Sequence, residues 1–250
     1  MASITAEMFS TGKYSDLLIK CQGRAFKVHR TVVCLQSKPL AAAIDGKFME
    51  AFSGEIDLDG NEPDIVYCML KFMYESNHSD GRDSDTTSST QSPAKKAEAT
   101  GSSLTFAADT STTKCLLLTN TKVYIIGDQL QIPDLKTLAK KKYEEVMLAA
   151  WDSVSFAANL KLLYEESMEN DRSLKDVAIH TAGDHAKELC DRGEFATLCR
   201  ENGEIAFDIL KASLTADPLV KTCPFRHQSN YVQHHCRGLT YCQSCGNYFN

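Results

Sequence analysis

The sequence has no long hydrophobic run. None of its apolar stretches approaches the roughly 18 residues that a membrane-spanning helix needs. Residues 1–16 contain Glu7 and lack both a basic region and an apolar stretch, so we expect no secretory signal. From these absences we expect an intracellular protein of the nucleus or the cytoplasm.

The chain also lacks an excess of positive charge. Its formal net charge is −6 and its pI is about 5.7, which argues against a protein that binds nucleic acid over its whole surface. After Asp217 no acidic side chain follows, while Lys221, Arg226 and Arg237 remain. We interpret this small local excess as incidental rather than as a phosphate-binding surface.

The sequence motifs of phosphate-binding loops, dinucleotide-binding folds, zinc proteases and serine hydrolases are missing as well. We therefore expect no enzyme, no catalytic residue and no bound organic cofactor. A cysteine nucleophile paired with a distant histidine stays open, and an unusually reactive Cys34 or Cys68 would favour it.

What is present is an ordinary globular composition. Hydrophobic residues make up 43% and charged residues 24% of the 250 residues, enough for one sizeable core or two small ones. Six of the ten cysteines stand singly among apolar neighbours, and we expect them to be small buried hydrophobic residues. These six are Cys21, Cys34, Cys68, Cys115, Cys190 and Cys199.

The stretch from Tyr14 to Tyr74 has the pattern of a folded α+β unit. Residues 16–21 and 26–28 read as two strands joined by a tight turn at Gln22-Gly23. We expect the following helix, 29–35, to turn Val32, Val33 and Leu35 inward. A second helix begins near Pro39, a short strand covers 55–58, and a helix with apolar residues three and four apart follows Pro63.

The composition changes abruptly after this stretch. Residues 77–113 are rich in Ser, Thr, Asp, Ala and Gly, and they cannot bury enough apolar surface to offset the entropy of ordering. We interpret them as a disordered insertion. Apolar periodicity then resumes at Cys115 and predicts helices over 115–130, from Pro133 to about 150, over 153–164, 173–190 and 204–214.

The order strand, strand, helix, helix, strand, helix and helical pair resembles the BTB/POZ family. The matching segments are Ser15-Asp16-Leu17, Phe26-Lys27-Val28-His29-Arg30-Thr31-Val32-Val33, Ser37-Lys38-Pro39-Leu40, Phe48-Met49-Glu50, Ile56-Asp57-Leu58, Val123-Tyr124 and Ile132-Pro133-Asp134-Leu135. The resemblance covers about residues 14–150, and the helices beyond look like the fungal branch of the family. It implies a BTB/POZ fold, a small sheet flanked by helices, interrupted by the insertion at about 77–113.

The resemblance also implies contacts with other proteins. In the family, an acidic residue on the first strand and a basic residue opening the next helix face each other at the centre of a homodimer, and here these are Asp16 and Arg30. The alternative is that Asp16 caps a turn and Arg30 lies on the surface. A lone histidine such as His29 is more often a hydrogen-bonded structural residue than a base or a ligand.

Many relatives bind a cullin, the scaffold of a ubiquitin ligase, through a hydrophobic-x-Glu motif, which Phe48-Met49-Glu50 matches. An exposed aromatic residue beside a charge is typical of an interface anchor, but Phe48 could equally belong to the core.

The remaining cysteines crowd into the tail. Cys242-Gln243-Ser244-Cys245-Gly246 is a C-x-x-C turn whose two thiolates can share one tetrahedral ion. Cys223 and His227 form a C-x-x-x-H partner for it, while His234, His235 and Cys236 are competing ligands. The tail resembles the zinc ribbons of related fungal proteins, and we expect structural Zn²⁺ here; a frayed tail with free thiols is the alternative.

These observations predict three parts: a BTB/POZ-like domain at 14–150, an all-helical extension at 151–216 and a small zinc-binding Cys/His knuckle at 217–250. We expect a protein-interaction adaptor or scaffold. A homodimer and a role as substrate adaptor of a cullin-linked ubiquitin ligase are two further features that the resemblance leaves open. The alternative is a transcription-associated factor that dimerises through the BTB domain and contacts nucleic acid through the zinc tail.

Overall fold

The computed structural model describes most of the chain. It covers residues 4–46, 49–78, 110–168 and 170–215, and the tail stretches 232–234, 240–242 and 248–249; for 110–115, 215 and the tail stretches it gives the backbone alone. The chain divides into two compact units, Met1–Lys175 and Asp176–Asn250. Among the described helices, none is both long and apolar enough to cross a membrane.

The first unit contains a three-stranded sheet of order β2-β1-β3. β1 (Leu17–Cys21) and β2 (Arg24–Val28) form an antiparallel hairpin, and β3 (Glu55–Asp57) runs parallel to β1. Gln22 and Gly23 in the connecting turn have φ values of 44° and 81°, the left-handed backbone that a two-residue hairpin turn requires. The hairpin that the sequence predicts is therefore confirmed.

Five helices accompany this sheet within the described stretches 4–46 and 49–78. They are α1 (Ile4–Thr11), α2 (Arg30–Gln36), α3 (Lys38–Asp45), α4 (Met49–Ser53) and α5 (Pro63–Glu75). The start of α3 follows from its sequence, because Ser37 caps it by accepting a hydrogen bond from the Leu40 N–H at 3.3 Å, and Pro39 suits the first turn. Neither α1 nor α4 was predicted from the sequence.

The expectation that Leu35 points inward is wrong. Val33 of α2 is fully buried, whereas Leu35 is 87% exposed. Two residues along an α-helix correspond to a rotation of roughly 200°, so only one of these two side chains can face the core. Leu35 consequently adds an apolar side chain to the surface.

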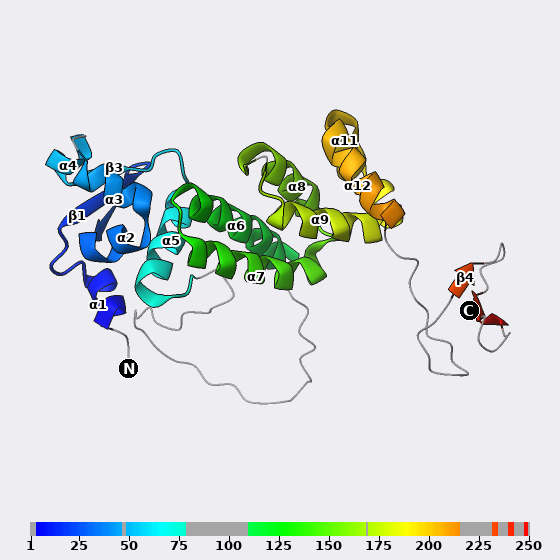
Figure 1. The fold of residues 1–250 in the computed structure, drawn as a ribbon, viewed down its shortest axis with the longest axis horizontal. Helices are drawn as coiled ribbons and strands as arrows, with labels where there is room; N and C mark the ends of the chain where they lie inside the picture. Colours follow the sequence, from blue (N-terminus) through cyan, green and yellow to red (C-terminus); the bar gives the residue numbers. More distant parts are fainter. Residues whose placement is uncertain are drawn as a thin grey trace, which may run out of the picture. The chain divides into compact units, whose positions relative to one another are not determined.

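The described residues of the first unit include three further helices: α6 (Thr110–Gln129), α7 (Pro133–Ala150) and α8 (Ser155–Glu166). α6 packs against α5, α7 and α8 (Figure 1). The Ser37 hydroxyl donates to the Leu130 carbonyl at 2.7 Å, and the Lys142 ammonium donates to the His78 carbonyl at 2.5 Å. The two stretches on either side of residues 79–109 therefore pack against each other, while the predicted insertion falls mostly outside the described residues.

A buried polar chain links these helices. The Tyr143 hydroxyl donates to the Asn159 side-chain oxygen at 2.7 Å, and the Asn159 amide donates to the Thr121 hydroxyl at 2.5 Å. All three side chains are fully buried, and burial raises the pKa of Tyr143 well above its ordinary value. Because an unpaired polar group in a core is costly, this chain favours one relative arrangement of α6, α7 and α8.

In the second unit the described residues form four helices and three short strands. The helices are α9 (Ser173–Asp184, which begins at the end of the first unit), α10 (Ala186–Cys190), α11 (Gly193–Glu201) and α12 (Gly203–Thr215). The predicted helix 173–190 is in fact two helices separated at His185. Gly183 allows close packing inside this unit, since a Cβ atom there would lie 2.9 Å from that of Ala212.

The tail strands form a second sheet. β4 (Val232–His234), β5 (Thr240–Cys242) and β6 (Tyr248–Phe249) pair in that order, and both pairings are antiparallel. The register sets Val232 opposite Cys242 and His234 opposite Thr240. Positions 234 and 242 thus belong to one face of the β4–β5 ladder, by the two-residue periodicity of strands.

Candidate protein-interaction site

Asp16 and Arg30, the residues proposed for a dimer centre, both take part in contacts within the single chain. The Asp16 carboxylate accepts a hydrogen bond from the backbone N–H of Arg30 at 2.8 Å, which caps the start of α2. The Arg30 guanidinium donates to the Ile44 carbonyl at 3.3 Å. Asp16 therefore caps the start of a helix and not a turn, and it remains exposed, whereas Arg30 is half-buried.

His29, directly before α2, is a buried structural residue, as its context predicts. Its Nε2 lies 2.8 Å from the Lys13 carbonyl oxygen, and its Nδ1 lies 2.8 Å from the Tyr74 hydroxyl. A carbonyl can only accept, so Nε2 carries the proton in the neutral ring and Nδ1 accepts from the phenol. His29 as a whole residue is only 4% exposed, and its contacts with Tyr74 join the start of α2 to α5.

The hydrophobic-x-Glu motif leads into α4. Phe48 lies outside the described residues, while Glu50 lies on α4 and is half-buried. Met49 and Phe52 of the same five-residue helix are 79% and 83% exposed. Phe52 was not singled out from the sequence; the signal available was its spacing of three from Met49, which puts both on one side of a helix.

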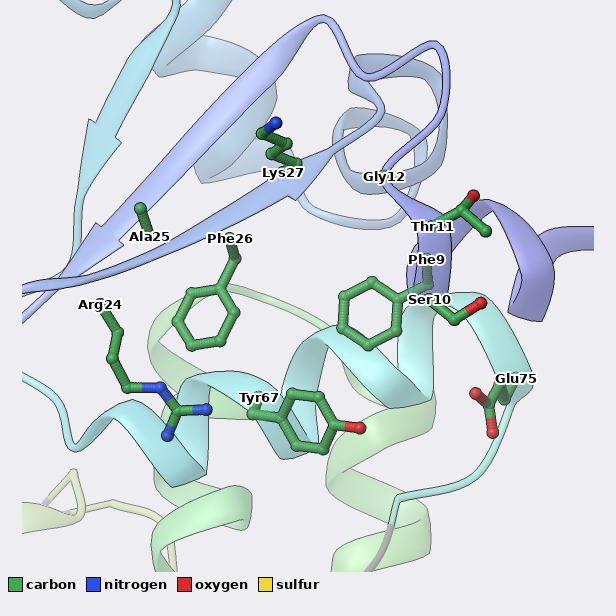
Figure 2. A pocket seen from close by; sticks show the side chains of 10 residues that line it. All are labelled: Phe9, Ser10, Thr11, Gly12, Arg24, Ala25, Phe26, Lys27, Tyr67 and Glu75. Atoms are coloured by element: carbon green, nitrogen blue, oxygen red, sulfur yellow. The ribbon is translucent and has the colours of Figure 1, made fainter. Parts of the chain in front are cut away.

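A groove of about 580 Å³ lies between β2, α1 and α5 (Figure 2). Three aromatic side chains line it: Phe9 of α1, Phe26 of β2 and Tyr67 of α5. The Phe9 and Tyr67 rings are stacked with centroids 5.6 Å apart, and the Arg24 guanidinium lies 5.2 Å from the Phe26 centroid. No sequence pattern indicated this groove, because α1 was not expected.

A second polar cluster joins α6 and α7 to the segment before α9. The Lys136 ammonium lies 2.5 Å from an Asp128 carboxylate oxygen and 2.7 Å from an Asp171 oxygen, and the Tyr124 hydroxyl donates to Asp171 at 2.8 Å. Partial burial acts to lower the pKa of Lys136, but its hydrogen bonds to the two carboxylates outweigh burial and raise that pKa. Burial likewise acts to raise the pKa of Asp171, and the hydrogen bonds it accepts lower it instead. Both groups stay charged at neutral pH.

Of the scattered cysteines, Cys21 and Cys68 are buried as expected and Cys34 and Cys199 are partly buried, whereas the expectation is wrong for Cys190, which is exposed. The Cys21 thiol is buried and donates to the Asn61 carbonyl at 3.1 Å. Burial is the main cause that raises the pKa of Cys21, Cys34 and Cys199. A raised pKa lowers the thiolate fraction, which is the nucleophilic form.

The metal ligands predicted from the sequence fall in the tail. Cys223, His227, His235, Cys236 and Cys245 lie outside the described residues, whereas His234 and Cys242 lie in β4 and β5, where the backbone alone is described. Within the described part of the chain, no group of three or more His, Cys, Asp or Glu side chains could hold a metal ion.

The comparisons with known proteins concern the first unit. No curated protein matches this chain. The family model described as the BTB/POZ domain matches residues 5–92, a range that includes the β2-β1-β3 sheet and helices α2–α5. The region with a small sheet flanked by helices, at residues 5–92, is thus a BTB/POZ domain, a module of protein–protein interaction.

Proposed function

We propose that this protein is an adaptor that links a scaffold protein to a client protein. The single observation that carries the proposal is the exposure of large apolar side chains at two separate places. Met49 and Phe52 on α4 are 79% and 83% exposed. On α12, Phe207, Leu210 and Leu214 are 66%, 54% and 77% exposed. Exposed apolar residues that gather on one element are typical of interaction surfaces.

The α4 surface is proposed as the contact for a cullin. Phe48-Met49-Glu50 supplies the motif, and Phe52 adds a second apolar anchor one turn further on. A large apolar side chain beside a carboxylate combines burial with a directional polar contact, as interface anchors do.

The α12 surface is proposed as the contact for the client. Phe207, Leu210 and Leu214 are spaced by three and four residues, so they form one stripe along the helix. The opposite stripe, Ile205 and Ile209, is buried in the second unit. An amphipathic helix or an apolar groove of the client fits such a stripe.

Two further elements belong to the proposal. A homodimer would use the exposed carboxylate of Asp16 and the guanidinium of Arg30 from opposite subunits. The tail would bind one structural Zn²⁺ through Cys223, His227, Cys242 and Cys245, with His234, His235 and Cys236 as competing ligands. The short strands of the tail sheet support metal binding. They have three, three and two residues, too few to form a hydrophobic core, so a bound metal ion would supply the missing stability.

Binding to a purified cullin N-terminal region tests the scaffold contact. We expect Phe48→Ala, Glu50→Lys and Phe52→Asp each to weaken binding by about tenfold or more, the cost of losing an interface anchor. Glu165→Lys is the matched control, because Glu165 is an exposed helical carboxylate on α8 whose side chain is 57% exposed. Unchanged binding of all three variants, or no binding of the wild type, would sink the scaffold contact.

The client contact is tested by affinity purification with mass spectrometry. Proteins lost with Leu210→Asp but retained with Glu50→Lys would be clients that use α12. The transcription-associated alternative predicts salt-dependent retention on DNA through Lys221, Arg226 and Arg237. Retention that disappears when these three residues are replaced by Gln would favour it over the adaptor.

A further inference from the structure

β2 is an edge strand of the first sheet among the described residues. The Leu18 N–H donates to the Gly54 carbonyl, and the Lys20 carbonyl accepts from the Leu58 N–H, so these two residues turn their backbone groups toward β3. Backbone groups alternate in direction along a strand, so Leu17, Ile19 and Cys21 turn theirs toward β2. The hydrogen-bonded partners on β2 are accordingly Val28, Phe26 and Arg24.

It follows that Ala25 and Lys27 turn their backbone N–H and C=O groups away from β1. Within the described part of the chain, no backbone group pairs with them. Both residues are exposed. Such an edge offers up to four main-chain hydrogen bonds to an added strand.

The groove lies directly beneath this edge. In Figure 2 the Arg24 and Phe26 side chains point from β2 toward Tyr67 of α5, and Phe9 of α1 lies in the middle of the groove. Arg24 lies at one end of the groove and Glu75 at the other. An added strand beside β2 would turn every second side chain into this groove and the alternate ones to the other face of the sheet. The aromatic lining suits an aromatic or large aliphatic side chain.

Charge indicates the kind of strand that fits. β2 carries two cations, Arg24 and Lys27, and no acidic residue. Pairing with β2 of a second copy would bring four cations together, and like charges on paired strands are destabilising. Arg24 forms an ion pair with Asp64 at 2.6 Å, but the two side chains are 51% and 89% exposed, so that pair is weak and exchangeable.

We propose that β2 binds an extended acidic segment of a partner protein by strand addition. The segment pairs with the backbone of Ala25 and Lys27, inserts an aromatic or large aliphatic side chain between Phe9, Phe26 and Tyr67, and carries acidic side chains beside Arg24 and Lys27. This site is separate from α4 and α12 and does not depend on the cullin contact.

The test starts with selection of a phage-displayed library of random 12-residue peptides on the full-length wild-type protein. We expect enriched peptides to carry an acidic residue two positions from an aromatic or large aliphatic residue, on the face beside Arg24 and Phe26, and another acidic residue at an adjacent position, on the face beside Lys27. Fluorescence anisotropy with a selected synthetic peptide should show binding about tenfold weaker to Ala25→Pro, because proline removes the outward N–H and leaves the β1–β2 hydrogen bonds intact. Ala25→Val, which keeps that N–H and favours strands, should bind like the wild type, and Lys27→Glu should bind about tenfold more weakly.

A second measurement leaves the protein unaltered. Methylating each backbone nitrogen of the peptide in turn should weaken binding about tenfold at alternate residues only, because an added strand directs every second N–H toward its neighbour. The proposal is overturned by a selection that enriches no peptide, by equal binding to Ala25→Pro and Ala25→Val, or by methylation without a two-residue period. The proposal is also overturned if sedimentation shows a dimer of the wild type that Ala25→Pro abolishes. That result would mean that the β2 edge binds a second copy of this chain.

Discussion

The hydroxyl of Tyr74 is bonded twice to His29: it accepts the backbone N–H of His29 at 2.8 Å and lies 2.8 Å from Nδ1 of the ring. With Nε2 donating to the Lys13 carbonyl, the phenol proton goes to Nδ1, and every polar atom in this group is satisfied. One hydroxyl thereby fixes α5, the start of α2 and the chain before β1.

Replacing that hydroxyl should destabilise the protein. Tyr74→Phe leaves the buried N–H of His29 and its Nδ1 without their partner, and we expect a loss of about 1–3 kcal/mol in the free energy of unfolding. Urea unfolding followed by circular dichroism measures it. Tyr67→Phe is the matched control on the same helix, since Tyr67 is 39% exposed; equal losses in the two variants would show that the bonding of Tyr74 is not the cause.

Two substitutions of Asp16 separate the effect of its hydrogen bond on stability from the effect of its negative charge on self-association. Asp16→Ala removes the acceptor for the Arg30 N–H and should lower stability by about 1 kcal/mol, whereas Asp16→Asn keeps an acceptor and should cost only a few tenths. If the carboxylate also lies at a dimer centre, Asp16→Asn should weaken self-association in analytical ultracentrifugation while stability changes little. A dimer unaffected by Asp16→Asn would assign the residue to capping alone.

The elements predicted from the sequence are those whose signals are local. Gln22-Gly23 specifies its turn by itself, and Pro63 and Pro133 each begin a helix as predicted. The BTB resemblance likewise depended on contiguous segments such as the F-K-V-H-R block. A pattern confined to a few neighbouring residues can be recognised without knowing the tertiary contacts.

The missed features depend on distant contacts or on short elements. α1, α4 and α11 have eight, five and nine residues, and none contains the proline that marks the first turn of α3. α9 ends before His185 without a proline to mark the break. The groove exists because Phe9 stacks on Tyr67, a contact between residues far apart in the sequence, and the open edge of β2 follows only from the strand order.

The Lys136–Asp171 pair should give stability a defined dependence on pH. The folded pKa of Asp171 is lowered, so its contribution is present above its ordinary value of 3.8 and is lost as the pH falls through the folded value. The folded pKa of Lys136 is raised, so its contribution is complete below 10.5 and is lost at higher pH. The pair therefore contributes constantly around neutral pH.

Asp171→Asn checks this dependence. At pH 7 we expect it to lower the free energy of unfolding by about 1.5–3 kcal/mol, the range for hydrogen bonds to charged groups. The difference from the wild type should shrink as the pH falls below about 4. Glu144→Gln is the control, because its pair with Lys140 is 3.8 Å long and exposed, worth about 0.5 kcal/mol or less. A difference that stays constant down to pH 2 would contradict the assignment.

The tail offers a prediction that needs no partner protein. Protein purified from zinc-supplemented cells should contain about one Zn²⁺ per chain by elemental analysis, because four Cys/His ligands close one tetrahedral shell. Cys242→Ser and Cys245→Ser should each lose most of it, whereas Cys190→Ser, which changes an exposed thiol on α10, should retain it. Comparing His227→Asn, His234→Asn, His235→Asn and Cys236→Ser identifies the remaining ligand among these four residues, since only the ligand's loss weakens binding. Equal zinc in all these variants, or a wild type that binds none, would refute the metal site.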